Sequence, residues 1–492
     1  MASTADLADL TDLVGLRRLG VGVLAVALTA VLVWFGTGLD PCWPLVWFAP
    51  LPVLLLAART RWWIAALAAA AAWSLGLLNL WHYVTAALHI PGAVVAQIYG
   101  TEAAAFVLAV LLYRALLRRG AYWAAVVAFP ATRVAFEYLT SAISPHGTAG
   151  SLAYSQLSFL PFLQLASITG PWGMTFLLLL FPAALAAAWQ LRRTRRRALR
   201  VLAAALGAII AVLVSGAVRL ALDTAGPTVK VGLVASDPPT SPQVADEGPA
   251  TAALFDAYAA RASALAAQGA RIIVLPEKLG VVVEPGTRDS DARFQALADT
   301  TGAIIVVGLI RVAPPVKYNE ARIYAPGSPV QRYTKHHLLP SFESKFVAGD
   351  ALALVSLPAA TLGVTICKDM DFTPLSRAYG HAGAALLLVP AYDFGLDRLL
   401  HGHMAVMRGV ESGFGLVRAA KNGYLTVSDN RGRILAEATS DAAPFATLLA
   451  DAPVAHAATL YLRFGDWFAW LALALLAATV VQLVRSRRVA RS

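Results

Sequence analysis

Residues 359–369 read Ala-Ala-Thr-Leu-Gly-Val-Thr-Ile-Cys-Lys-Asp, an apolar run that ends in a polar turn. The apolar part predicts a buried strand at 359–366, so that Cys367 stands at the carboxyl end of that strand. Pro374 suits the first turn of a following helix. A strand, a polar turn and a helix in this order are typical of an α/β domain.

Two isolated polar groups lie upstream in similar settings. Glu277 ends the apolar stretch Ile272-Ile273-Val274-Leu275-Pro276, and Lys335 follows Tyr333-Thr334. A carboxylate can take the proton of a thiol, and a cation can stabilise first the thiolate and then an oxyanion. The ordered set Glu277, Lys335 and Cys367 therefore supplies a base, a cation and a nucleophile for acyl transfer through a thioester.

The composition indicates an integral membrane protein. Hydrophobic residues make up 58% of the 492 positions and charged residues only 14%, whereas a soluble protein has about 25% charged residues. The net charge of +11 does not indicate nucleic-acid binding, because residues 229–454 hold 20 Lys and Arg against 21 Asp and Glu. The basic excess lies instead beside the apolar segments, as is typical of cytoplasmic loops.

The apolar segments divide the chain into three parts. Residues 1–224 are predicted to form a membrane domain with seven transmembrane helices, residues 228–455 a globular domain, and residues 459–492 a last transmembrane helix with a basic tail. Spans of membrane-crossing length lie near residues 20–38, 43–58, 62–82, 92–113, 121–138, 171–190, 200–221 and 463–484. The globular region alternates strand-like and helix-like segments, which predicts an α/β domain with strands buried on both faces.

The arginines predict the orientation of these spans. They gather in alternate loops and at the two ends: Arg17, Arg18, Arg59, Arg61, Arg114, Arg118, Arg119, Arg192, Arg193, Arg195, Arg196, Arg197, Arg200, Arg485, Arg487, Arg488 and Arg491. The other short loops contain no basic residue. Both termini are therefore predicted to be cytoplasmic, with the globular domain on the outer face of a bacterial inner membrane.

Two features near the outer ends of the spans have alternative interpretations. Residues 139–170 are rich in Ser, Gly and Pro yet apolar, which favours a re-entrant or interfacial segment over a poorly structured outer loop. Arg133 and Glu137 are one helical turn apart. Such ionisable groups are either functional or paired for structure, and we favour structural pairing.

The globular domain resembles the nitrilase superfamily of carbon–nitrogen hydrolases, which has an α-β-β-α sandwich fold. The matching motifs are Leu275-Pro276-Glu277, Tyr333-x-Lys335-x-x-Leu338 and Ile366-Cys367-x-Asp369, with Glu343 at the position of a second supporting glutamate. With spans on both sides of this domain, the whole chain resembles the bacterial apolipoprotein N-acyltransferase family. Further matching segments are Tyr154-Ser155-Gln156, His403-Met404-Ala405-x-Met407-Arg408-x-x-Glu411 and Arg418-Ala419-x-x-Asn422-Gly423.

The resemblance implies an N-acyltransferase that works by a ping-pong thioester mechanism. Cys367 takes an acyl chain from a membrane phospholipid and passes it to the amine of a diacylated apolipoprotein. Glu277 is implied as the base, Lys335 as the oxyanion partner and Glu343 as their support. The reaction requires no metal and no dissociable cofactor.

Two differences from the family pattern leave the substrates open. Lys368 and Asp369 follow the nucleophile where the family usually has Tyr-Glu, and we favour a solvated Lys368 over one that contacts lipid phosphate or tunes the thiol. The segment between Glu343 and Cys367 is short, which leaves Phe342 and Phe346 as candidate apolar contacts beside Lys368 and Asp369 on the substrate side. A membrane-anchored amidase or nitrilase, a paralogue that acylates another amine, and an inactive lipoprotein-binding scaffold are the alternatives.

Overall fold

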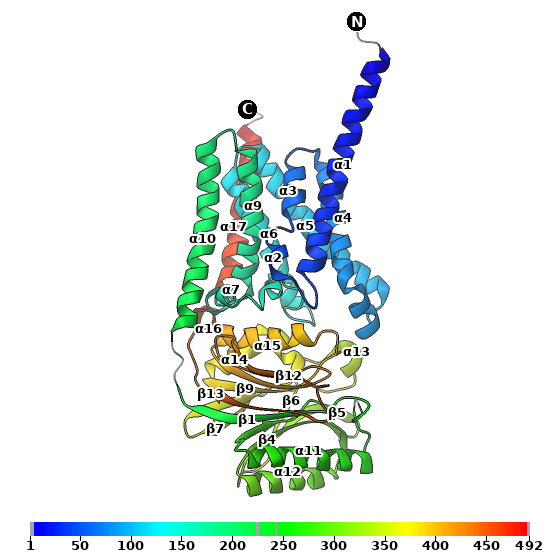
Figure 1. Cartoon of the computed structure of the whole chain (residues 1–492), viewed down its shortest axis with the longest axis vertical. Coiled ribbons are helices and arrows are strands. Elements are labelled where there is room, and N and C mark those ends of the chain that lie inside the picture. Colours follow the sequence, from blue (N-terminus) through cyan, green and yellow to red (C-terminus); the bar gives the residue numbers. More distant parts are fainter. Residues whose placement is uncertain (1–3, 223–225, 243, 490–492) are drawn as a thin grey trace.

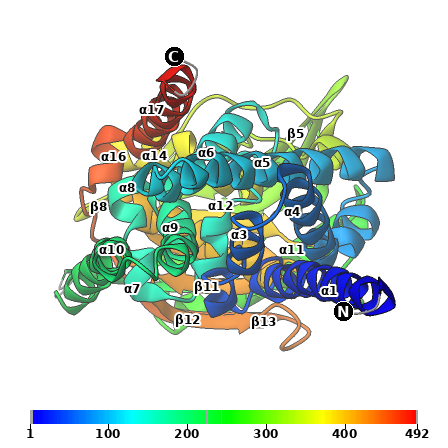
Figure 2. The same ribbon diagram turned by 90° about the horizontal axis from the view of Figure 1, so that it is seen from above.

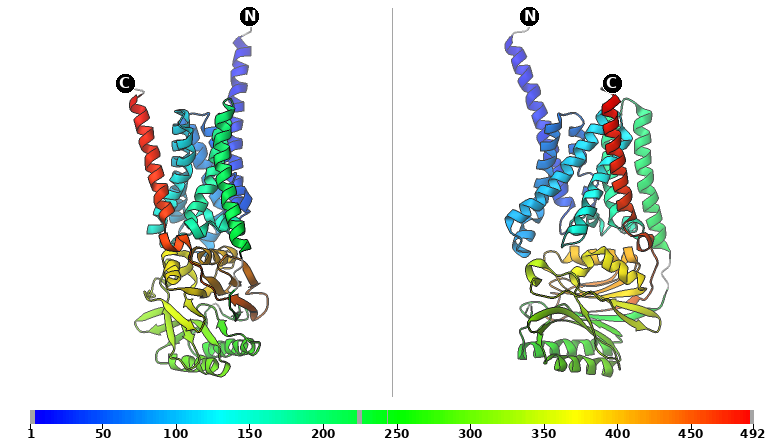
Figure 3. Two further views of the ribbon diagram at one scale, coloured as in Figure 1. Left: turned by 90° about the vertical axis from the view of Figure 1, so that its left-hand side faces the viewer. Right: turned by 180° about the vertical axis from the view of Figure 1, so that it is seen from behind.

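The computed structural model describes residues 4–222, 226–242 and 244–489, so that Arg491 and the predicted domain end at residue 224 lie outside it. A set of long helices stands on a globular part built of two sheets (Figure 1). Helices α1 and α17 both run away from the globular part (Figure 3). Figure 2 shows the long helices from above, standing over the sandwich.

The described residues contain six helices long and apolar enough to cross a membrane. They are α1 (Thr4–Gly36), α4 (Trp62–Leu77), α5 (Gly92–Arg118), α9 (Pro171–Gln190), α10 (Arg195–Ala221) and α17 (Trp467–Val489). Helix α6 (Tyr122–Ile143) packs against α5, α9 and α17 and carries the Arg133–Glu137 pair. That pair is 3.0 Å apart, and Arg133 also pairs with Glu102 at 2.5 Å, which confirms the predicted structural pairing.

The structure differs from the prediction at the second span. Residues 43–57 form two short helices, α2 (Trp43–Val46) and α3 (Leu51–Ala57), instead of one long helix. Pro50 and Pro52 explain the break, since proline has no N–H to donate and its ring disfavours the helical conformation of the residue before it.

The segment at 139–170 is folded and largely buried, as expected for an interfacial or re-entrant segment. It contains η3 (Leu152–Gln156), α7 (Leu160–Leu163) and α8 (Ala166–Thr169). It also contacts the globular part, because the Thr148 amide donates to the Asp371 carbonyl at 3.1 Å and Gln164 Nε2 donates to the Arg431 carbonyl at 2.9 Å. This segment therefore forms much of the junction between the two parts.

The globular part contains two stacked sheets with strand orders β13-β1-β2-β4-β5-β6, with β3 beside β4, and β12-β11-β10-β9-β8-β7. The strands are β1 (Thr228–Ala235), β2 (Ile272–Val274), β3 (Val281–Val283), β4 (Ile304–Ala313), β5 (Val316–Tyr324), β6 (Gln331–Thr334), β7 (Ala353–Leu357), β8 (Ala360–Val364), β9 (Ala384–Tyr392), β10 (Gly415–Lys421), β11 (Tyr424–Ser428), β12 (Ile434–Thr439) and β13 (Ala446–Pro453). The central strands β1, β2 and β4 are parallel, as are β8, β9 and β10.

Helices cover the outer face of each sheet. Helices α11 (Pro249–Ala267) and α12 (Thr287–Thr301) pack on the first sheet, while α14 (Thr373–His381) and α15 (Arg398–Ser412) lie between the second sheet and the long helices (Figure 1). Apolar side chains of both sheets, such as Leu233, Val274 and Leu388, fill the core between them. The predicted α-β-β-α sandwich is confirmed. The remaining short helices are η1 (Leu78–Leu80), η2 (Tyr83–Ala87), α13 (Pro340–Glu343), η4 (Cys367–Asp371) and α16 (Leu460–Phe464).

Candidate active site

Cys367 lies at the first position of η4, just after strand β8. Its φ is +45°, in the left-handed region that residues with a side chain rarely adopt. The strain of such a conformation is usually tolerated where the surrounding structure holds it for function. The Cys367 thiol donates to the Tyr392 carbonyl at 3.6 Å, so the sulfur is held at the carboxyl end of β9.

Asp369 holds the turn that carries the thiol. Its carboxylate accepts hydrogen bonds from the Ile366 amide at 3.2 Å, the Tyr333 hydroxyl at 2.7 Å and the His337 amide at 2.8 Å. The side chain is fully buried and does not line the cavity at the site. Asp369 was expected on the substrate side. Instead its carboxylate accepts hydrogen bonds from these protein donors and stabilises the turn, away from the cavity.

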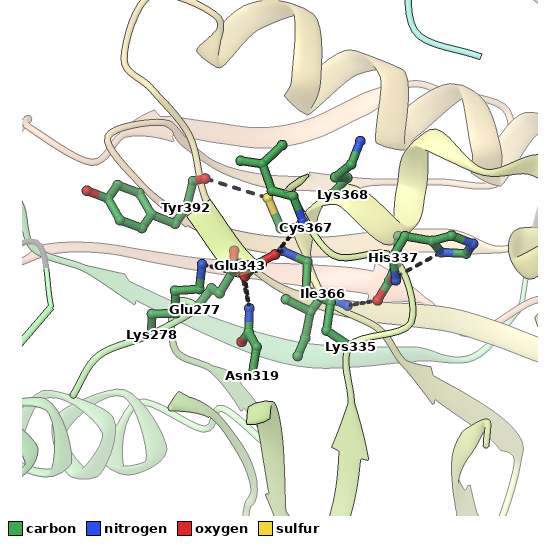
Figure 4. A network of polar contacts seen from close by, with 12 residues as sticks. Glu277, Lys278, Asn319, Lys335, His337, Glu343, Ile366, Cys367, Lys368 and Tyr392 are labelled. Atoms are coloured by element: carbon green, nitrogen blue, oxygen red, sulfur yellow. Dashed lines mark hydrogen bonds and ion pairs between the residues drawn. The ribbon is translucent and has the colours of Figure 1, made fainter. Parts of the chain in front are cut away.

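Two carboxylates and two ammonium groups alternate beside the thiol (Figure 4). Lys335 Nζ lies 2.9 Å from Glu277 Oε1 and 3.1 Å from Glu343 Oε2. Lys278 Nζ lies 2.5 Å from Glu343 Oε1 and 3.8 Å from Glu277 Oε1. The structure thus brings together Glu277, Lys335, Glu343 and Cys367, and it adds Lys278 to them.

Asn319 on β5 joins the two carboxylates. Its Nδ2 donates to Glu277 Oε1 at 2.6 Å and to Glu343 Oε1 at 2.7 Å, while its backbone carbonyl accepts from the Lys335 amide at 2.9 Å. Gly308 on the neighbouring strand β4 admits the Glu277 backbone, because a Cβ there would lie 2.4 Å from the Pro276 carbonyl oxygen. Strands β4 and β5 of the first sheet therefore position both Glu277 and Lys335.

The surrounding charges set the protonation of the site. Burial and the nearby Glu277 carboxylate raise the pKa of the Cys367 thiol, although Lys335 opposes them, so the resting thiol is protonated. Burial alone would lower the pKa of Lys335, but Glu277 and Glu343 outweigh it and raise that pKa, which keeps the ammonium charged. Burial opposes ionisation of Glu343, yet Lys335 and Lys278 lower its pKa to about 2. The thiol therefore needs a base at the moment of attack.

One cavity of about 780 Å³ connects this cluster with the long helices. At one end its wall includes Glu277, Lys335 and Cys367. At the other end the wall comes from the membrane part, including Trp73 and Leu77 of α4, Ile98 and Tyr99 of α5, and Phe136 of α6. The cavity therefore joins the Cys367 sulfur to apolar side chains of the long helices.

The other residues predicted on the substrate side line this cavity. Phe342 and Phe346 both belong to its wall, and the Phe342 ring lies 5.9 Å from that of His89 in the loop between α4 and α5. Lys368 also lines the cavity, with its side chain only 7% exposed. The favoured interpretation of Lys368 as a solvated residue is therefore wrong, because the segment at 139–170 covers it.

Comparisons with known proteins agree with this architecture. The profile of the apolipoprotein N-acyltransferase N-terminal domain matches residues 29–185, and that of carbon-nitrogen hydrolases matches residues 234–457. Its two parts thus resemble the two parts of apolipoprotein N-acyltransferases.

Curated apolipoprotein N-acyltransferases match over both parts of the chain. The apolipoprotein N-acyltransferase of Geobacter metallireducens is 28% identical over 397 residues, which cover 74% of each chain. That of Bradyrhizobium diazoefficiens is 28% identical over 380 residues, 69% of each chain. Among solved structures, an amidase from Nesterenkonia sp. matches 49% of this chain and 95% of its own, with 22% identity and a TM-score of 0.42.

Sequence reasoning missed several residues of the site. Lys278 directly follows Glu277, but only the fold shows that its side chain turns toward Glu343. Asn319 lies in Lys317-Tyr318-Asn319-Glu320, a polar run that signals a solvated edge and not a buried strand. His146 belongs to the segment at 139–170 and meets Lys368 only through tertiary packing. The spacing of these residues along the sequence does not indicate that their side chains meet in the fold.

Proposed function

We propose that the chain moves an acyl chain from a membrane phospholipid, through a thioester on Cys367, to the N-terminal amine of an S-diacylglyceryl-cysteine lipoprotein. The observation that carries the proposal is the cavity that opens from the Glu277–Lys335–Cys367 cluster into the long helices. A soluble amidase needs no such connection. The matching family profile and the names of the curated relatives support the same conclusion.

In the first step Glu277 takes the proton of the Cys367 thiol, and the thiolate attacks the ester carbonyl of the phospholipid. Lys335 and backbone N–H groups of the nucleophile turn stabilise the oxyanion of the tetrahedral intermediate. The carbon–oxygen bond then breaks, and Glu277 returns its proton to the departing lysophospholipid oxygen. The acyl group is left on sulfur, and charge is balanced.

In the second step the lipoprotein amine attacks the thioester carbon. Glu277 takes the proton that the amine loses, the carbon–sulfur bond breaks, and the proton passes to the Cys367 sulfur. Glu343 supports both steps, since its Oε2 lies 3.1 Å from Lys335 Nζ and holds that ammonium group beside Glu277. The ammonium thus stays in place whether Glu277 is charged or neutral.

We further propose that both termini are cytoplasmic and that the globular domain lies outside the inner membrane. Helix α5 begins three residues after His89, whose ring contacts Phe342 of the globular domain. The helix is 27 residues long and ends at Arg118. This length corresponds to about 40 Å. Arg118 lies beside Arg59, Arg61 and Arg114 at that remote end, where the positive-inside rule expects the cytoplasm.

The two cysteines of the chain permit a matched test of the nucleophile. Purified protein in detergent micelles is incubated with a phospholipid that carries a radiolabelled acyl chain, and the protein-bound label is measured. The Cys42→Ala variant should keep the hydroxylamine-sensitive label of the wild type, and Cys367→Ala should lose it. Label that persists after Cys367→Ala would refute the thioester step.

The acceptor is tested by complementation. A strain depleted of its own N-acyltransferase receives the gene for this chain, and mass spectrometry examines the N-terminal peptide of a lipoprotein. We expect one additional acyl chain on the amine. An acyl-enzyme that forms but releases only free fatty acid would instead identify a membrane-anchored hydrolase.

A further inference from the structure

Lys368 presents a buried ammonium group to the cavity next to the nucleophile. Its Nζ lies 3.2 Å from His146 Nδ1, the one acceptor that the described residues place within hydrogen-bond distance. The nearest carboxylate oxygen, Asp371 Oδ2, is 3.6 Å away. An ammonium group has three protons to donate, so donors remain for a ligand in the cavity.

His146 completes a pair of donors at this place. Burial and the Lys368 charge lower the pKa of His146 to about 4, so the ring is neutral near pH 7. Since Nδ1 accepts from Lys368, the neutral ring carries its proton on Nε2. Lys368 comes from the nucleophile turn and His146 from the segment at 139–170, and both line the cavity.

The other charged groups on this side of the cavity already have close partners. The Asp393 carboxylate accepts hydrogen bonds from both terminal nitrogens of Arg418, at 2.5 and 2.9 Å. His401 Nδ1 lies 3.2 Å from the Asp397 carboxylate. Among the described residues, the Lys368 ammonium contacts His146, the Asp371 carboxylate at 3.6 Å and the Phe372 ring at 5.4 Å, so it retains donors for an anion in the cavity.

We propose that Lys368 and His146 form a subsite for the phosphodiester group of the acyl donor, a subsite that rests on the proposed function. In a glycerophospholipid the reacting ester and the phosphate are joined through one three-carbon glycerol unit. Figure 4 shows Lys368 extending from Cys367 on the side opposite Lys335, so the ester and the phosphate can occupy the two sides of the sulfur. Charge-assisted hydrogen bonds to phosphate are among the strong ones.

The test compares two acyl donors with the same acyl chains, one with and one without a phosphodiester head group. Full-length protein in detergent micelles receives either phosphatidylglycerol or the diacylglycerol with the same labelled chains, and the rate of Cys367 acylation is measured. Wild-type protein should prefer the phospholipid by at least about tenfold. Lys368→Gln and His146→Gln should reduce this preference, while Lys368→Arg keeps it.

The exposed Lys317 provides the matched control, because Lys317→Gln removes a charge from the same domain outside the cavity. Equal wild-type rates with the two donors would overturn the subsite, as would a Lys368→Gln variant that slows both donors by the same factor. Failure of both donors to label Cys367 would instead refute the proposed function.

Discussion

The charge balance around Glu277 depends on single residues. Glu277 and Glu343 face Lys335 and Lys278, and all four polar ends lie within one network of 2.5–3.8 Å contacts. Two carboxylates with one ammonium between them would favour sharing a proton, since like charges raise a carboxyl pKa. Lys278 adds a second ammonium group, and together with Lys335 it lowers the pKa of Glu343.

The first prediction concerns Lys278. Replacing it in Lys278→Gln leaves Lys335 as the ammonium shared by Glu277 and Glu343, while Lys421 is a poor substitute because burial lowers its pKa to about 7. The pKa of Glu343, which Lys278 helps to lower, should then rise. Because the proposed mechanism needs charged carboxylates beside Lys335, the acidic limb of the acylation rate should shift to higher pH by about one pH unit or more.

The Lys278→Arg variant is the matched control, because it keeps the positive charge at the same place. Its acidic limb should stay within a fraction of a unit of the wild type. A Lys278→Gln enzyme that is slower at every pH, with an unmoved acidic limb, would show that Lys278 only shapes the site.

At the scale of elements, the nucleophile turn η4 depends on one buried carboxylate. Asp369 accepts hydrogen bonds from groups of three segments: the Ile366 amide, the Tyr333 hydroxyl and the His337 amide. Together these bonds hold Cys367 in its left-handed conformation between β8 and η4. The turn is therefore braced from β6 and the loop after it, and not by its own residues alone.

The second prediction tests this bracing. In Asp369→Asn one oxygen becomes an NH₂ group that faces N–H or O–H donors, which should cost about 1–3 kcal/mol of folding stability. We expect a lower melting temperature by calorimetry and slower acylation of Cys367. Asp350→Asn, at an exposed position of the same domain, should leave both unchanged. An unaltered melting temperature for Asp369→Asn would mean that the turn holds itself.

The elements that the sequence revealed are those with uniform burial. Strands β1, β2, β4 and β9 are apolar runs, which fit the predicted alternation of strand-like and helix-like segments in the globular region. Strand β5 was missed, because its buried positions are polar. They include Asn319, Glu320 and Arg322, which pair with Glu277, Arg311 and Asp291 respectively. The ordered polar residues identified Glu277, Lys335 and Cys367, whereas Lys278 and Asn319 became visible only once the fold had brought β5 beside them.

At the scale of the whole molecule, the two parts are fastened by polar contacts around the cavity. The Tyr83 hydroxyl donates to Asp397 at 2.6 Å, and Arg408 donates to Thr148 at 3.3 Å while it pairs with Glu411. Helix α15 carries Arg408, directly follows Asp397 and faces the long helices. The globular part is thus held with its active site toward the membrane part.

The last prediction asks whether the cavity is the route of the acyl donor. Ala87 ends the short helix η2 and lines the cavity wall, away from the Glu277–Lys335–Cys367 cluster. A tryptophan there fills space that a lipid chain needs, and overpacking or blocking of this kind should slow acylation by phospholipid at least about tenfold. A small reagent such as iodoacetamide needs less room, so it should still alkylate Cys367 within about twofold of the wild-type rate.

Ala93→Trp is the matched control, since Ala93 is exposed, lies six positions further along the same region and is not part of the cavity wall. Both rates should remain unchanged in that variant. If Ala87→Trp slowed iodoacetamide and phospholipid equally, the tryptophan would have disturbed the active site itself. If it slowed neither, the donor would reach Cys367 by another path. Selective loss of the lipid reaction is the outcome that a continuous route from the long helices to the thiol requires.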